Sequence, residues 1–328
     1  MAIHTPLTES FGLDYPIVLA PMGGAAGGRL AAAVSNGGGL GLVGGGYGDP
    51  EWLRRELALV TRESTRPWGA GLLAWRTTPE LVEMILSFRP AAFLLGFGDP
   101  HPHIPAIKAA GCAVICQVQD VEMATQAVVA GADVIVAQGS EAGGHGSVRA
   151  TLPLVPAVVD AVSPVPVLAA GGIADGRGLA AALMLGAHGV LMGTRFVATS
   201  ESLTHEGAKG KIISARGGET ARTQIFDVMR GLDWPNPFTG RILRNSFFER
   251  WQGREAELEA HLESERAGYR RAVEAGDFDT VGVSAGEAVD LITSVLPAAD
   301  VVRQIGAEAE AQLRRGAMLL ANSHAAAR

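Results

Sequence analysis

One histidine and a few glycine pairs are the residues of this chain whose types and spacing could do chemistry. His145 lies in EAGGHGS, a Gly-flanked loop directly after an apolar run, with few apolar neighbours to bury against. An imidazole in such a loop can act as a base or as a hydrogen-bond donor near neutral pH. A surface loop histidine is the alternative interpretation, and we prefer it for most of the other histidines.

Glycine turns follow two neighbouring apolar runs: the pair Gly171–Gly172 in AAGGIADGRG, and Gly193–Thr194 in MGTRF. Glycine lets a ligand approach the backbone closely, and free amide N–H groups at a helix start can hold an anion. A single glycine turn would indicate only a tight connection, but two at neighbouring strands favour a phosphate site. The predicted phosphate-binding residues are Gly171, Gly172, Gly193 and Thr194.

Three other motifs do not predict a functional site. The glycines of GLGLVG at 39–44 fit GXGXXG, but the Leu and Val residues between them place the motif inside a strand. His101 and His103, in DPHPHIP, lack acidic partners and indicate a turn, so we predict no metal site. The only two cysteines, Cys112 and Cys116, are too few for a zinc site and are interpreted as free buried thiols.

Eight short apolar runs occupy the first two thirds of the chain, and helix-like segments separate them. Near-continuous hydrophobicity is what strands buried on both faces require, so the runs predict a parallel sheet covered by helices. The expected strands are 16–22, 40–46, 68–75, 91–98, 113–118, 133–139, 166–172 and 189–196. The expected helices include 28–36, 50–62, 78–88, 121–131, 152–162 and 176–186.

Eight such units predict an α/β fold of the (β/α)8 TIM-barrel class; an open doubly wound sheet would not need a regular repeat of eight. From 201 to 290 no strand run is visible, and alternating charges at 249–271 indicate a solvated helix face. An amphipathic segment at 298–321 is placed to be the eighth barrel helix. We expect a barrel of residues 1–200 and 291–328, with a helical lobe, 201–290, inserted between strand 8 and the last helix.

Composition limits the class of protein. The chain has 328 residues, 48% hydrophobic and 19% charged, which is enough to bury a sizeable core and excludes disorder for most of its length. A net charge of −7 disfavours nucleic acid and anionic membrane as partners. Neither a secretory signal nor an apolar stretch of about 20 residues is visible, so we expect a soluble, cytoplasmic protein.

Taken together, the motifs resemble those of the nitronate monooxygenase family, formerly called 2-nitropropane dioxygenases. They are LAPMGG, AQGSEAGGHGS and PVLAAGGIADGRGLAAALMLGAHGVLMGTRF. The resemblance covers about 10–200 well, and the lobe more loosely through GRILRNSF and GVSAGEAVDLI. It implies a barrel that holds FMN non-covalently at its mouth, with the phosphate at the glycine turns. His145 matches the catalytic histidine of the family.

The resemblance also implies contacts with the rest of the flavin. We expect three residues to pack under or beside the flavin: Pro21, Met22 and Gly23. Gln138 would contact the ring or the ribityl chain, and Gly143 and Gly144 would line the flavin. One position departs from the family: Gly71 stands where members commonly have Asn, so an amide that would bind the flavin is missing. Gln117, at the end of the fifth strand, is a candidate replacement.

Four lobe residues are candidates for an apolar substrate wall: Trp234, Phe238, Phe247 and Phe248. The alternative, that they form the core of the lobe itself, is equally consistent with their type.

The resemblance implies oxidation of an alkyl nitronate with O2 to a carbonyl compound and nitrite. His145 would take the proton alpha to the nitro group or stabilise the nitronate. One alternative is an FMN-dependent NAD(P)H oxidoreductase of the enoyl-acyl-carrier-protein or quinone reductase type; another is a non-catalytic flavin-binding barrel. The expected partners are a nitronate or nitroalkane and O2, with a homodimer as one option for assembly.

Overall fold

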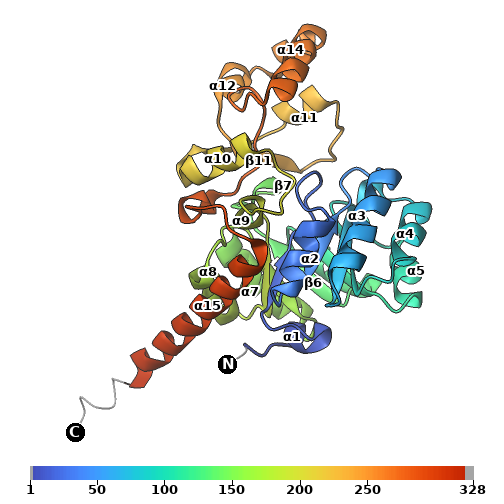
Figure 1. Cartoon of the computed structure of the whole chain (residues 1–328), viewed down its shortest axis with the longest axis vertical. Coiled ribbons are helices and arrows are strands. Elements are labelled where there is room, and N and C mark those ends of the chain that lie inside the picture. Colours follow the sequence, from blue (N-terminus) through green and yellow to red (C-terminus); the bar gives the residue numbers. More distant parts are fainter. Residues whose placement is uncertain (1–2, 322–328) are drawn as a thin grey trace.

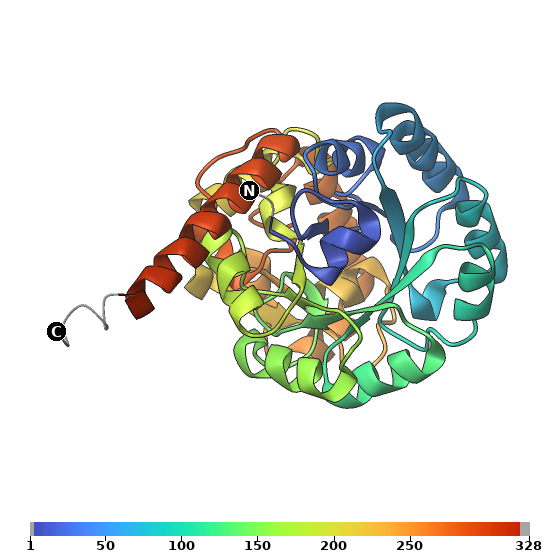
Figure 2. The same cartoon turned by 90° about the horizontal axis from the view of Figure 1, so that it is seen from below.

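Eight parallel strands form a closed barrel in the computed structural model, which describes residues 3–321. The strand order is β1-β9-β8-β6-β5-β4-β3-β2, and a bridge between Val18 and Leu40 closes the ring. Helices surround it (Figure 2). The strands are β1 (Ile17–Leu19), β2 (Gly41–Gly44), β3 (Trp68–Leu73), β4 (Ala92–Gly96), β5 (Ala113–Val118), β6 (Val134–Gln138), β8 (Val167–Ala170) and β9 (Gly189–Met192).

The predicted TIM-barrel class is confirmed, and each barrel strand lies within its predicted range. The runs are continuous because both faces of each strand are buried. Val43 and Phe93 pack outward against the helices, and Leu42 and Leu94 pack into the barrel interior. The glycines at 39–44 belong to β2 and its start: a Cβ at Gly41 would lie 1.9 Å from the carbonyl oxygen of Ala31, so glycine allows close helix–strand packing there.

The covering helices begin at recognisable caps. Asp49, Asp120 and Asp175 each accept a backbone N–H in the first turn of the following helix. The covering helices are α2 (Gly28–Asn36), α3 (Pro50–Glu63), α4 (Pro79–Leu86), α5 (Ile104–Ala109), α6 (Val121–Ala130), α7 (Thr151–Val162) and α8 (Gly176–Met184). All six predicted helices are present, and α5 is additional because its apolar pattern is only six residues long.

Two terminal helices complete the barrel. Helix α15 (Ala298–Ala321) packs against α8 and α2, which confirms it as the eighth barrel helix, and Val301, Val302 and Ile305 join the outer core. Its last turns project away from the body (Figure 1). Helix α1 (Pro6–Phe11) contributes Leu7 and Phe11 to the inner cluster, so it plugs the bottom of the barrel.

The barrel interior changes character toward the carboxyl ends of its strands. Aliphatic side chains such as Leu94, Val136 and Leu168 fill the lower interior. Because inward positions alternate along a strand, the next ones toward the mouth can be read from the pairing register. They are glycine or glutamine: Gly44, Gly71, Gly96, Gln117 and Gln138. The mouth is therefore lined by backbone and two amides.

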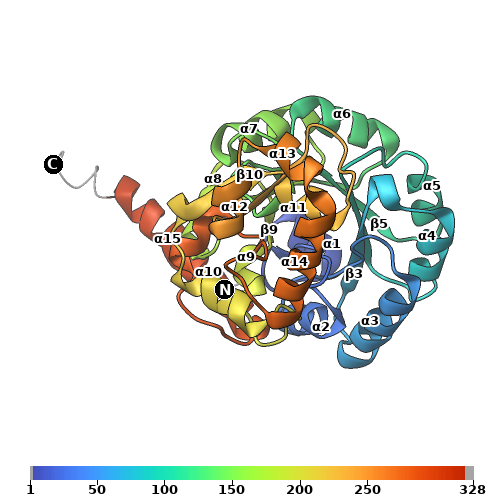
Figure 3. The ribbon, with the colours of Figure 1, turned by 90° about the horizontal axis from the view of Figure 1, so that it is seen from above.

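The lobe, residues 201–290, lies over that mouth (Figure 3). It follows the short helix α9 (Thr194–Val197), and its elements are α10 (Glu206–Ser214), β10 (Thr220–Thr223), α11 (Ile225–Arg230), β11 (Thr239–Leu243), α12 (Ser246–Trp251), α13 (Glu255–Ala260) and α14 (Leu262–Ala275). Three short 3-10 turns are at Ala74–Arg76, Gly217–Glu219 and Glu287–Leu291.

The expectation that the lobe contains no strand is wrong. Strands β10 and β11 form an antiparallel sheet with β7 (Gly144–Gly146), which comes from the loop after β6. Their sequences, TART and TGRIL, are short and carry arginines, so they lack the apolar run on which the prediction depended. The sheet joins the lobe to the loop that contains His145.

An aromatic core holds the outer part of the lobe together. It contains Phe226, Phe247, Phe248, Trp251 and Tyr269, all buried. Within the described part of the chain, we find no helix with the length and apolar character needed to cross a membrane.

Candidate active site

His145 lies at the barrel mouth in the centre of β7, where it pairs with Gly240 of β11. Its Nε2 lies 2.8 Å from Oδ2 of Asp227, and its side chain is 12% exposed. Its carbonyl oxygen accepts a 2.9 Å hydrogen bond from the side-chain amide of Gln138. Instead of a loose surface loop, the histidine therefore occupies a strand fixed from both the barrel and the lobe.

Asp227, on α11, is the residue that sequence analysis missed. It is buried, and its Oδ1 accepts a 2.8 Å hydrogen bond from Arg230. A buried carboxylate requires such partners because desolvation of an unpaired charge is costly. The available signal was a lone acid within the apolar segment IFDVM, since an isolated carboxylate among buried apolar residues needs a polar partner nearby.

Trp234 stacks on the histidine. The two ring centroids are 3.4 Å apart and their planes differ by 6°, so the indole covers one face of His145. Trp234 belongs to an aromatic cluster, called here the aromatic roof, in which each ring lies within 7 Å of another. Its members are Tyr47, Trp75, Phe97, Trp234 and Phe238.

The aromatic roof combines loops of the barrel with the lobe. Tyr47, Trp75 and Phe97 follow β2, β3 and β4, and the indole N–H of Trp234 donates a 3.0 Å hydrogen bond to the Tyr47 hydroxyl. Phe97 has φ +60°, which is uncommon for a bulky residue and is maintained by edge contacts with Trp234 and Phe238. Within the described residues, the buried Trp75 Nε1 has no hydrogen-bond partner.

The four aromatic candidates of the lobe fall into two groups. Trp234 and Phe238 line the side of the lobe that faces His145, as a substrate wall would. Phe247 and Phe248 pack with Trp251 and Tyr269 in the core of the lobe. The lobe-core interpretation therefore holds for Phe247 and Phe248, and the substrate wall stays a prediction for Trp234 and Phe238.

Charged side chains fix the loop between β6 and β7. The carboxylate of Glu141 accepts hydrogen bonds from the backbone N–H and the hydroxyl of Thr151, and so caps α7. The carbonyl of Ser140 accepts from the guanidinium groups of Arg222 and Arg241. Burial, together with the neighbouring Arg241, lowers the pKa of Arg222 to about 10.

The glycine turns after β8 and β9, Gly171–Gly172 and Gly193–Thr194, present free backbone amides. Gly171 and Gly172 have φ of +101° and +71°, which side chains rarely adopt. Within the described chain, Gly172 and Gly193 donate no backbone hydrogen bond, and Thr194 begins α9, where helical N–H groups have no internal acceptor. The Thr194 hydroxyl accepts from the N–H of Gly286.

The loop after β1 folds across the ends of β2 and β3. A Cβ at Gly71 would lie 2.4 Å from Cγ of Pro21, and a Cβ at Gly23 would lie 2.7 Å from Cα of Gly46. Met22 reaches the other side of the mouth, where its sulfur would be 3.2 Å from a Cβ at Gly193. The Asn common at position 71 in the family therefore cannot fit here unless Pro21 moves.

Two predicted amides lie on inward positions of the barrel. Gln138 accepts a 2.8 Å hydrogen bond from Gln119, a buried residue not predicted for the site, whose own oxygen has no partner in the described structure. The amide of Gln117 forms no hydrogen bond with any described residue and lies beside Gly96. Gly143 contacts Ala285 and Gly286 through its backbone, and Gly144, with φ +69°, borders open space.

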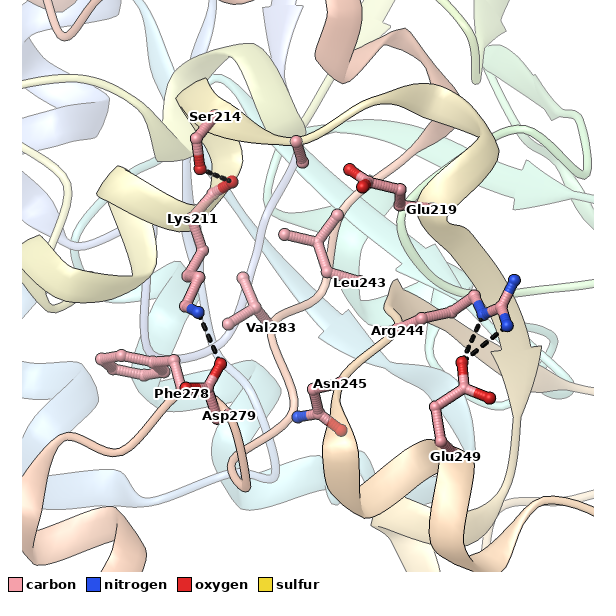
Figure 4. Close-up of a pocket in the computed structure, with 11 residues that line it drawn as sticks. Lys211, Ser214, Glu219, Leu243, Arg244, Asn245, Glu249, Phe278, Asp279 and Val283 are labelled. Carbon is pink, nitrogen blue, oxygen red and sulfur yellow. Dashed lines mark hydrogen bonds and ion pairs between the residues drawn. The ribbon is translucent and has the colours of Figure 1, made fainter.

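Other sequence candidates lie outside this site. His101 lies in an exposed turn, as predicted, but it pairs with Asp99 two residues earlier, so the expectation that it lacks an acidic partner is wrong. The free Cys112 and Cys116 are buried in the outer core, as predicted. A cavity of about 500 Å³ opens within the lobe, but none of the predicted site residues lines it (Figure 4). Its cations are paired, Lys211 with Asp279 and Arg244 with Glu249.

The fold is a TIM barrel with an imidazole and an edge of unpaired backbone amides at its mouth, where enzymes of this fold hold their active sites. A family model described as nitronate monooxygenase matches residues 4–80 and 77–308, and the chain belongs to that family. It is therefore an oxidoreductase of a flavin-dependent type.

Individual relatives support the same family and broaden its chemistry. Nitronate monooxygenase npaC of Metarhizium robertsii is 36% identical, and the match covers 95% of each chain. The Mycobacterium tuberculosis (3aS,4S,5R,7aS)-5-hydroxy-7a-methyl-1-oxo-octahydro-1H-indene-4-carboxyl-CoA dehydrogenase is 38% identical over 70% of this chain, but the match spans only 65% of its own length. The structure of FabK from Thermotoga maritima superposes with a TM-score of 0.85 at 34% identity, covering 96% of this chain and 98% of that one.

Proposed function

We propose that the chain is an FMN-dependent nitronate monooxygenase, which oxidises an alkyl nitronate with O2 to a carbonyl compound and nitrite. The observation that carries the proposal is His145, held by Asp227 at the mouth of a barrel with free amides at its edge. Membership of the family and the relative that matches over 95% of its length support it.

The residues present fit FMN. The free amides of Gly172 and Gly193, with Gly171 and Thr194 beside them, match the needs of a phosphate. The unpaired amide of Gln117 and the inward-facing Gln138 offer hydrogen bonds to a flavin ring. The remaining contacts would come from the backbone of Gly71 and from Pro21, Met22, Gly23, Gly143 and Gly144.

When bound, FMN supplies the exchange of electrons between the nitronate and O2. The chain itself binds and orients the substrate. His145 takes a proton from the carbon alpha to a nitro group, or donates a hydrogen bond to a nitronate oxygen. The aromatic roof covers the site, excludes water and offers apolar contact to an alkyl chain.

The visible spectrum of the purified protein tests cofactor and reaction together. We expect a yellow protein whose flavin absorbance bleaches on anaerobic addition of an alkyl nitronate and which releases nitrite in air. Two results would contradict the proposal: protein that stays colourless after soaking in excess FMN, or bound flavin that no nitronate bleaches.

A second candidate function is a flavin-dependent NAD(P)H oxidoreductase. The dehydrogenase from M. tuberculosis and the similarity to FabK favour it, because neither is named as a monooxygenase. The same anaerobic experiment separates the two candidates: rapid bleaching by NADH or NADPH without nitronate would favour this function.

A further inference from the structure

Asp227 is the lobe carboxylate that contacts the candidate base. Oδ2 of Asp227 lies 2.8 Å from Nε2 of His145, and both side chains are nearly buried. The other ring nitrogen, Nδ1, has no hydrogen-bond partner among the described residues. The two nitrogens of this imidazole are therefore in different environments.

This difference decides which nitrogen is basic. An ionised carboxylate can only accept hydrogen bonds, so Nε2 carries the proton that it accepts, and in the neutral ring Nδ1 holds the lone pair. We propose that Asp227 is a positioning residue that fixes His145 as the Nε2–H tautomer and makes Nδ1 the atom that removes the substrate proton. The role of that proton transfer rests on the proposed function, whereas the tautomer does not.

The proton transfer is balanced within the substrate and His145. The C–H bond alpha to the nitro group breaks, its proton bonds to Nδ1, and its electron pair stays on the substrate, which becomes a nitronate. The imidazolium that forms is paired with the Asp227 carboxylate through a charge-assisted hydrogen bond at Nε2. No oxidant takes part in this step.

None of the other titratable or aromatic groups described around this pair supplies a second carboxylate to His145. Arg230, on the same helix, binds the second oxygen of Asp227. Burial raises the pKa of Tyr47, from the loop after β2, and that of Tyr269, on α14, so both phenols stay neutral at neutral pH. Trp234 covers a face of the ring and carries no charge.

Nitrogen-15 NMR of histidine-labelled full-length protein at pH 8 measures the tautomer directly. The His145 signals are assigned by their loss in His145→Gln. We expect a protonated Nε2 and an unprotonated Nδ1 in the wild type. A His145 ring protonated at Nδ1 would overturn the proposal, whatever the enzyme oxidises.

Asp227→Asn tests the consequence for chemistry. The amide keeps the shape of the side chain, but it can donate to Nε2 and move the ring proton to Nδ1. We expect oxidation of a neutral nitroalkane to fall at least about 100-fold, as when the orienting acid of a catalytic histidine is neutralised. Oxidation of the preformed nitronate, which needs no proton removal, should change little, with FMN content unchanged.

Asp233→Asn is the matched control, because Asp233 is an exposed acid in the next segment and does not contact His145. It should behave as wild type, and Asp227→Glu, which keeps a carboxylate, should recover part of the nitroalkane activity. Equal losses on both substrates in Asp227→Asn, or no loss, would overturn the proposal. If Asp227→Asn does not fold, the wild-type NMR result and Asp227→Glu still decide. If the wild type oxidises neither substrate, the proposed function fails, and the NMR result alone judges the tautomer.

Discussion

The barrel and the lobe both contribute to the site around His145, the barrel mainly with backbone groups and the lobe with side chains. Barrel strands are apolar on both faces, and five of them end in glycine or are followed directly by it, so at the mouth the barrel offers much free backbone. The lobe sheet carries Arg222 and Arg241 on its strands, and the lobe reaches the site through the side chains of Asp227 and Trp234. Backbone amides suit a phosphate that is the same in every FMN molecule. Side chains differ with the sequence, so they suit a substrate that differs between enzymes.

This contrast implies a division of work that experiments can separate. Changes at the glycine edge of the barrel should act on cofactor retention, and changes in the lobe should act on turnover and substrate choice. The predictions below test that division, starting with the residue where the two regions meet.

His145→Ala should have the largest effect, because it removes the group that both regions hold. We expect nitrite release from a neutral nitroalkane to fall about 10²–10⁴-fold, the usual range for loss of a general base. Bound FMN, measured by absorbance per protein, should remain at the wild-type level. His261→Ala, an exposed lobe histidine, is the control. Unchanged nitrite release in His145→Ala would remove this residue from the reaction.

Two buried phenylalanines compare the regions directly. Phe93 lies in the barrel core and Phe248 in the lobe core, and both are fully buried. Truncation to Ala should reduce the free energy of unfolding by about 3–5 kcal/mol in each case. We expect Phe93→Ala to lose FMN and activity together on mild heating, and Phe248→Ala to lose activity while FMN remains bound. Simultaneous loss of both in Phe248→Ala would show that the two regions unfold as one unit.

Gly172→Val tests the glycine edge. Its φ of +71° strains a β-branched residue by about 1–3 kcal/mol, which should raise the Kd of FMN by about tenfold. Fluorescence titration of the apoprotein with FMN measures this change. Gly111→Val is a closely matched control, because Gly111 has the same φ of +71° on an exposed turn before β5. Equal FMN affinity in both variants would place the phosphate elsewhere.

Trp234→Ala should have a smaller effect, confined to substrate binding. Aromatic contacts of this kind contribute about 0.5–1.5 kcal/mol, so the KM for apolar nitronates should rise by about 2–12-fold. Phe247→Leu, in the lobe core, should lower stability and leave KM unchanged. An unchanged KM in Trp234→Ala would show that the aromatic roof stabilises the fold and does not contribute to substrate binding.

The two cysteines should show no effect at all in the folded protein. Burial raises the pKa of the Cys112 and Cys116 thiols to about 12, so both remain protonated and unreactive at pH 8. Iodoacetamide should label neither until the barrel unfolds, as mass spectrometry can report. Because the folded pKa is raised, their contribution to stability is complete below the unfolded pKa near 8.5 and declines as pH rises toward 12.

The barrel was predictable from local sequence, because each strand lies in an apolar run and most covering helices begin at a side-chain cap or a proline. Because His145 and the glycine turns directly follow predicted strands, the sequence alone placed them at the barrel mouth. The strands β10 and β11 were not predictable, since TART pairs with TGRIL, and TGRIL with β7, only in the folded lobe. Asp227 is 82 residues from His145 in the chain, so only the folded lobe reveals their contact.

The pairing of β7 with β11 has a practical meaning for engineering. The lobe enters after α9 and leaves before α15, so a graft of residues 201–290 from another family member would have both junctions outside the histidine loop. The grafted lobe would supply the residues at the positions of Asp227 and Trp234, and the recipient barrel would supply His145. If the proposed function holds, such a chimera should take its substrate preference and its proton-transfer residues from the donor of the lobe, and its FMN-binding residues from the recipient barrel.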